Sequence, residues 1–257
     1  MPRSHSRRRR SVRYALAGLS LAVAACAQAP VTGRNQLILV PESQVNEMGL
    51  AAYQQIKQES DISRDPELNR VVERVGRRIA EVSPHPEWEW EFTVFDNPEP
   101  NAFALPGGKV GVNTGLFKVA KNEAQLATVI GHEVAHAIAR HGSERMSQGL
   151  LTQGLGALAV GTGVNPQVVD LAAQAATLGV ILPYSRTQES EADHIGLLYM
   201  AQAGYDPREA IELWQNFNAL GGARPPEFLS THPEPGSRIE RLQELMPEAL
   251  EVYEEQQ

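Results

Sequence analysis

The residues with the most evident chemistry are His132, Glu133 and His136, which form the motif His-Glu-Val-Ala-His. The pattern of residues 122–140 around them predicts a helix. Histidines four positions apart share one helix face, so both imidazoles can reach one tetrahedral zinc ion. Glu133 would then be placed to take a proton from the water that attacks a substrate. Because this motif arises by chance in about one chain of this length in a hundred, a metal site also needs a third ligand.

His141 is the nearest further histidine, but its surroundings do not fit a ligand. A catalytic zinc site needs three protein ligands and one open position. The extended pattern HExxHxxGxxH would supply the third ligand, with glycine at position 139 and histidine at position 142. The chain has Ala139 and Gly142 at these positions. This excludes the extended pattern.

Glu189 and Asp193 are better candidates for completing the site. They are four positions apart on a predicted helix, so their carboxylates share a face. Glu189 could bind zinc, and Asp193 could accept the free N–H of a ligating histidine. The small side chain of Ala192 would let the two helices approach closely. The residues alone leave open the alternative that this is a solvated acidic helix face.

Taken together, residues 132–136 and 189–193 resemble the zinc endopeptidases of the CAAX prenyl protease type, gluzincins that share HExxH…ExxAD. Within this group the chain is most similar to soluble bacterial lipoproteins related to the mitochondrial overlapping-activity protease. Further matching stretches are Val31–Leu37, Asn101–Gly108 and Ser230–Pro233. The resemblance covers about residues 31–245. It implies an α+β, mainly α-helical zincin-like domain with a small sheet or hairpin beside the HExxH helix, and one Zn²⁺ per chain.

The resemblance also implies roles for individual residues. The implied zinc ligands are His132, His136 and Glu189, the implied general base and later proton donor is Glu133, and Asp193 supports a ligand. His232 and Arg238 are implied catalytic residues, as donors that could stabilise an oxyanion. A second role stays open for His232, which could bind zinc as a fourth ligand and hold the enzyme latent.

Residues 101–112 predict a β-hairpin, because Pro106-Gly107-Gly108 is a turn signal between two short apolar runs. In gluzincins a strand edge beside the active site pairs with the extended backbone of a substrate, a mode that tolerates many sequences. The predicted substrate-binding residues are Asn101, Ala102, Phe103 and Ala104. The alternative for Phe103 is a place in the core.

The other elements follow from helical and alternating patterns. We expect helices from Pro41 to about Glu59 and from Pro66 to about Ile79, a strand at residues 88–95, and mostly helix after Leu116. Residues 150–182 are nearly uncharged and rich in glycine. They predict either a helical hairpin on the core or a mobile flap over the cleft or at the membrane surface.

The first 25 residues predict an export signal. Residues 1–13 contain six arginines and no acidic residue. They are followed by an apolar stretch at residues 14–25, which is too short to span a bilayer comfortably. The segment ends Val-Ala-Ala-Cys26, which resembles a lipobox, and Cys26 is the single cysteine of the chain. We therefore expect lipidation at Cys26, with a tether at residues 26–40, a metallopeptidase domain at residues 41–247 and an acidic tail at residues 248–257.

Charge excludes one class of partner. Without the six arginines of residues 1–25, the net charge falls from −8 to about −14, which is a poor basis for binding nucleic acid. The expected function is a zinc endopeptidase on the periplasmic side of the bacterial envelope, anchored in the outer membrane, that degrades unfolded or misassembled envelope proteins. The alternative is an envelope chaperone or assembly factor with latent protease activity. A general base at Glu133 argues against a purely binding or structural zinc protein.

Overall fold

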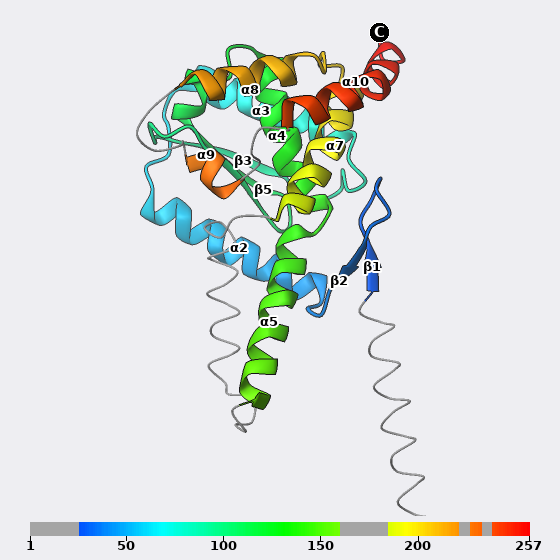
Figure 1. The fold of residues 1–257 in the computed structure, drawn as a ribbon. Helices are drawn as coiled ribbons and strands as arrows, with labels where there is room; N and C mark the ends of the chain where they lie inside the picture. The colour runs from blue at the N-terminus through cyan, green and yellow to red at the C-terminus, as the bar shows by residue number, and fades with distance from the viewer. Residues whose placement is uncertain (1–25, 160–184, 221–226, 233–237) are drawn as a thin grey trace, which may run out of the picture.

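The computed structural model describes residues 26–159, 185–220, 227–232 and 238–257 (Figure 1). Its architecture is α+β and mainly α-helical, as predicted. The helices are α2 (Glu42–Glu59), α3 (Pro66–Glu81), α4 (Glu123–Ile138), α5 (His141–Ala159), α7 (Arg186–Gln202), α8 (Glu209–Ala219), α9 (Glu227–Thr231) and α10 (Arg238–Glu254), with a 3₁₀ turn, η1 (Thr114–Lys118). The strands are β1 (Cys26–Gln28), β2 (Asn35–Leu37), β3 (Glu91–Phe95), β4 (Ala102–Leu105) and β5 (Lys109–Asn113).

Caps at the N-termini fix where the two central helices begin. The side chain of Asn122 accepts a hydrogen bond from the backbone N–H of Gln125 and so starts α4. Ser185 and Gln188 form a reciprocal capping box at the start of α7. Since α4 carries the HExxH motif and α7 carries Glu189, these caps set the register of the residues with chemistry.

The sheet has the order β3-β5-β4, with β3 and β5 parallel and β4 antiparallel to β5. The predicted hairpin is confirmed, and the turn uses positive φ angles at Gly107 and Gly108. Strand β3 begins at Glu91, later than the predicted Trp88. Strand β4 lies at the edge of the sheet and packs on α4.

Helix α4 lies at the centre of the molecule and is buried on nearly every side. It packs on α3, α7 and α8 (Figure 1) and on β4. Its closest neighbour is α7, and the two helices meet at Gly131 and Gly196. A Cβ atom on Gly196 would lie 2.7 Å from the backbone nitrogen of His132, and one on Gly131 would lie 2.9 Å from the carbonyl oxygen of Gly196. The close approach of α4 and α7, which was expected from the small side chain of Ala192, therefore also depends on these two glycines. Ala192 is fully buried.

We predict that Gly196→Ala lowers the free energy of unfolding by about 1–3 kcal/mol, because the added methyl group must push α7 away from α4. The same displacement should weaken metal binding, since His132 lies at the contact. Thermal unfolding and metal affinity measure both effects. Gly149→Ala in α5 is the matched control, because a Cβ there meets no atom within 4 Å. It should be neutral or stabilise by roughly 0.5–1 kcal/mol. Equal stability of the two variants would contradict the close contact.

The structure differs from the expected division at both ends of the domain. Residues 26–40, expected as a tether, contain the hairpin β1–β2, which packs on α5. Residues 248–257, expected as an acidic tail, largely belong to α10, which continues past Pro247 to Glu254. Ala249 is fully buried there, and Val252 and Tyr253 pack on the core. Apolar side chains at helical spacing thus extend the domain beyond the proline.

Two predicted segments lie outside the described residues. These are the export signal at residues 1–25 and most of the uncharged stretch at residues 150–182, of which positions 150–159 are helical in α5. Within the parts of the chain that the structure describes, no helix is both long enough and apolar enough to cross a bilayer.

Candidate metal centre

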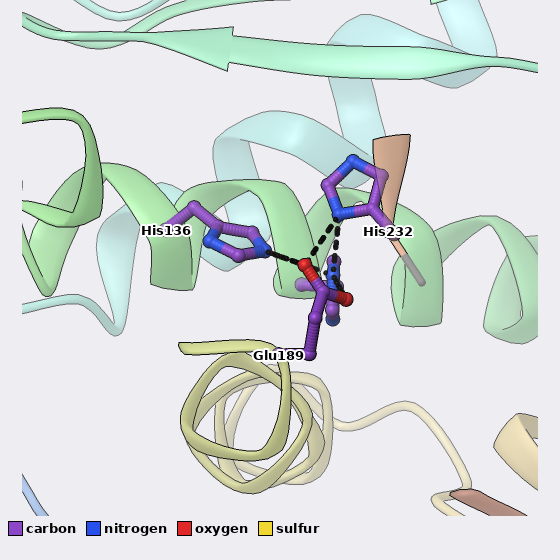
Figure 2. A group of neighbouring side chains, drawn as sticks. His136, Glu189 and His232 are labelled. Carbon is purple, nitrogen blue, oxygen red and sulfur yellow. Dashed lines mark hydrogen bonds and ion pairs between the residues drawn. The ribbon is translucent and has the colours of Figure 1, made fainter. Parts of the chain in front are cut away.

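Four buried side chains converge on one point. They come from three segments: His132 and His136 from α4, Glu189 from α7, and His232 from the end of α9. Their ligand atoms all lie within 4.8 Å of one another. The Nε2 atoms of His132 and His136 are 3.0 Å apart, and Nδ1 of His232 is 3.0 Å from Oε1 of Glu189. Figure 2 shows both His136 and His232 turned toward the Glu189 carboxylate.

The charge of the site suits a cation. Burial opposes a charge on His132, but Asp193 and Glu189 outweigh it and raise the pKa of His132 to about 9. Burial lowers the pKa of His136 well below its usual value, which favours the neutral imidazole that can bind a metal. The carboxylates thus favour positive charge at His132, while burial keeps the imidazole lone pair of His136 available. Imidazole nitrogens and a carboxylate oxygen are the donors that zinc prefers.

Asp193 and Arg238 lie behind the four candidate donors. Oδ1 of Asp193 is 2.9 Å from Nδ1 of His132, where it can fix the ring with Nε2 toward the metal. Arg238 donates from Nε to Asp193 at 2.7 Å and from Nη2 to Glu189 at 2.5 Å. Burial raises the pKa of Asp193, but the charge of Arg238 and the contact with His132 bring it below the ordinary value.

The position of Arg238 differs from the expected one. The resemblance implied a donor to an oxyanion, but the guanidinium is buried and hydrogen-bonded to two carboxylates. Its Cζ lies over the Trp214 ring, 4.0 Å from the ring centroid. The guanidinium is thus engaged by the carboxylates of Glu189 and Asp193. Its place in the structure favours a role in holding Glu189 and Asp193.

Glu133 lies beside the four donors and does not point among them. Its Oε2 accepts a hydrogen bond from the backbone N–H of Ala104 at 3.0 Å, and its Oε1 is 3.3 Å from Nε2 of His232. Burial raises the pKa of Glu133 above its ordinary value. A carboxylate with a raised pKa next to a metal centre is suited to taking up and returning a proton.

His232 contacts both the metal donors and Glu133. Its Nδ1 is 3.2 Å from Nε2 of His132, while its Nε2 faces Glu133. The ring is stacked on Phe228, with centroids 4.5 Å apart, and Phe228 packs in turn on Phe217. The aromatic side chains therefore hold His232 at the metal centre in this structure.

The predicted substrate strand has its outward N–H groups already bonded. Because Asn113 N–H donates to the carbonyl of Asn101, the antiparallel alternation turns the backbone groups of Ala102 and Ala104 toward the free edge. The N–H of Ala102 donates to the Asn101 side chain, and that of Ala104 donates to Glu133. Phe103 stacks on Phe95 with centroids 5.8 Å apart. This packing supports the alternative, a structural place for Phe103.

Sequence reasoning missed part of the site. His141, set aside as a ligand, is fully buried, and its Nδ1 lies 2.8 Å from Nδ1 of His136. Glu191 lies behind it, with Oε2 2.9 Å from Nε2 of His141. The one sequence signal for this part of the site is the position of His141, which follows shortly after the end of the motif helix.

The fold and the site together define a metallopeptidase of the HExxH type with a glutamate from a second helix. The chain belongs to peptidase family M48, whose family model matches residues 63–246.

Among its relatives is the mitochondrial metalloendopeptidase OMA1 of Schizosaccharomyces pombe, 36% identical over 229 residues, which are 86% of this chain and 66% of the relative. The OMA1 of Arabidopsis thaliana is 45% identical over 170 residues, 65% of this chain and 34% of the relative. The beta-barrel assembly-enhancing protease of Escherichia coli is 30% identical over 203 residues, 75% of this chain and 42% of the relative. The chain thus spans about a third to two thirds of the length of these relatives.

Proposed function

We propose that this chain is a zinc endopeptidase of the bacterial envelope that degrades unfolded or misassembled envelope proteins. The observation that carries the chemistry is Glu133 beside the four convergent donors. The setting is supported by the predicted export signal and by similarity to a beta-barrel assembly-enhancing protease. The expected place is the periplasmic side of the outer membrane, with a lipid on Cys26.

In the proposed mechanism His132, His136 and Glu189 would hold the zinc ion. When bound, zinc supplies a Lewis acid that polarises the scissile carbonyl and makes water a better nucleophile. Glu133 takes the proton of the attacking water and gives it to the leaving amine. The carbonyl groups of Ala102 and Ala104, at the free edge of β4, accept hydrogen bonds from an extended substrate.

A cleft next to His136 gives a place for a substrate side chain. Its walls include Trp88, Ala104, Leu105, Pro106, His136 and Met146. The surface of the cleft is mostly apolar, although the charged side chains of Glu42, Arg140 and Arg145 also line it, and Ala104 and Leu105 belong to β4. Unfolded proteins offer both parts of what this surface would bind, an extended backbone and exposed apolar side chains. The cleft therefore supports unfolded proteins as the substrate class, without preference for one particular sequence.

The lipid anchor predicts a change in location. In cell fractionation, Cys26→Ser is expected to move the protein from the membranes to the soluble periplasmic fraction, because the thiol that carries the lipid is lost. Metabolic labelling with a radioactive fatty acid should mark the wild type and not the variant. If the variant stays in the membranes, the anchor lies elsewhere in the chain.

His232 is proposed to be a fourth metal donor that keeps basal proteolysis low. Its Nδ1 lies 3.0 Å from Oε1 of Glu189 and 3.2 Å from Nε2 of His132. This closeness to two of the other donors supports metal binding by His232 over stabilisation of an oxyanion. This contact also favours the second candidate function, a chaperone with latent protease activity.

We predict that His232→Ala raises the rate of casein hydrolysis about tenfold or more, which corresponds to at least ~1.4 kcal/mol of lost inhibition. His194→Ala is the control, because His194 lies on α7 and pairs with Glu248 at 2.9 Å, away from the donors. A lower rate in His232→Ala, with metal retained, would instead support stabilisation of an oxyanion.

A further inference from the structure

We propose that Arg34, in the N-terminal hairpin β1–β2, is a positioning residue of the metal centre that acts on His136 through Glu191 and His141. The hairpin would then complete the metal site, although its sequence carries no ligand. The inference rests on the metal-binding part of the proposed function. It is carried by a continuous series of contacts that runs from the half-buried Arg34 through buried side chains to His136.

The first contacts join Arg34 to two carboxylates. Its Nε donates to Oε2 of Glu191 at 2.8 Å, and its two Nη atoms donate to the two oxygens of Glu144, each at 2.8 Å. The hydroxyl of Thr32 donates to the other oxygen of Glu191. The Glu191 and Glu144 side chains are only 3% and 7% exposed. Buried carboxylates need such pairing, and the planar fork of arginine suits a two-point contact.

The next contacts run from Glu191 to the ligand. Oε2 of Glu191 is 2.9 Å from Nε2 of His141, and Nδ1 of His141 is 2.8 Å from Nδ1 of His136. When Nε2 of His136 holds the metal, its Nδ1 carries the proton and donates to Nδ1 of His141. His141 then has its own proton on Nε2 and donates to Glu191. An anionic Glu191 thus selects the tautomers that leave the lone pair of His136 for the metal.

The other motif histidine has a matching arrangement. His132 faces Asp193, and Asp193 accepts a hydrogen bond from Arg238. Each motif histidine is therefore backed by a carboxylate and an arginine, directly for His132 and through His141 for His136. The two arginines come from opposite ends of the described chain. The parallel indicates that Arg34 serves the metal site in the way that Arg238 does.

The hairpin is built to hold Arg34 in place. Its turn closes with Gly33 at φ +64°, and Ala29 N–H donates to the carbonyl of Arg34 at 2.9 Å. Gln36 donates to the carbonyl of Ala139 at 2.6 Å, at the corner between α4 and α5. His136 and His141 project from the two sides of this corner. The hairpin therefore contacts the backbone that carries these histidines as well as the carboxylates behind them.

The test is zinc affinity, measured by competition with a chromophoric chelator on the full-length purified protein. Arg34→Gln is expected to weaken Zn²⁺ binding 10–100-fold, the usual loss when support behind a ligand is removed. Arg34→Lys should recover part of the affinity, because it keeps the charge without the two-point fork. Arg74→Gln is the control, since Arg74 pairs with Glu123 on the exposed surface at 2.6 Å.

A second variant keeps the inference testable if Arg34→Gln folds poorly. Glu191→Gln should weaken Zn²⁺ binding by a similar factor, and the double variant should be little worse than either single one, because both act through one series of contacts. ¹⁵N NMR of the histidine rings should show changed tautomers in both variants. Unchanged zinc affinity in folded Arg34→Gln or Glu191→Gln would overturn the inference. Failure of the wild type to bind zinc would instead overturn the proposed function.

Discussion

Glu133→Gln is expected to lower peptide hydrolysis by about 10²–10⁴-fold while leaving metal binding intact. Glutamine matches the size of Glu133, and its carbonyl oxygen can still accept the hydrogen bond from Ala104 N–H, which is 3.0 Å long in the wild type. The amide cannot take a proton from water at neutral pH. The fold and the four donors should thus persist, and only the proton transfer should be lost.

Hydrolysis of casein and metal content per chain are measured together for this variant. Glu212→Gln on α8 makes the same chemical change at an exposed position, and it should hydrolyse casein at the wild-type rate. If Glu133→Gln keeps most of the wild-type rate while holding its metal, another group is the base. If it loses the metal, Glu133 supports the metal centre, and the assignment of roles is wrong.

Glu189→Gln should have the largest effect on the metal centre itself. Glu189 is fully buried and accepts from Arg238 at 2.5 Å. Burial opposes its charge, but His232, His132 and His136 hold its pKa far below the ordinary value. The neutral amide lacks the negative charge that would bind the metal and replaces one carboxylate oxygen with an NH2 group. It also leaves Arg238 with Asp193 as its remaining carboxylate among these contacts. We expect at least a hundredfold loss of zinc affinity and about 3 kcal/mol of lost stability in the metal-free protein.

Both effects are separable by experiment. Zinc competition gives the affinity, and denaturant unfolding in the presence of a chelator gives the stability without metal. The wild type should gain stability on zinc loading, by about 4 kcal/mol when free zinc is a thousandfold above its Kd. The variant should gain little. A variant that binds zinc as tightly as the wild type would remove Glu189 from the ligand set.

The sequence predicted the parts of the site that depend on local spacing. His132 and His136 share a helix face, as do Glu189 and Asp193, and the caps at Asn122 and Ser185 set both registers. The hairpin beside the motif helix followed from its turn residues. These features are local, so a single chain reveals them.

The parts that the sequence did not predict depend on contacts between distant residues. Arg34 contacts Glu191 and Glu144, which are 157 and 110 positions away in the sequence. No pattern in the sequence around Arg34 indicates either of these partners. The glycine contact between α4 and α7 is similar, because Gly131 and Gly196 are ordinary helical positions until the helices are packed. Strands β1 and β2 have three residues each, too few for a clear alternating pattern.

The central claim is that a bound metal and Glu133 cut peptide bonds within a chain. The most direct test incubates the purified protein with casein and analyses the products by mass spectrometry, with zinc bound, after chelation and after zinc is restored. We predict internal cleavage that disappears with the chelator and returns with Zn²⁺ at one ion per chain. Zinc bound at one ion per chain without any internal cleavage, in the wild type and in His232→Ala alike, would contradict the account.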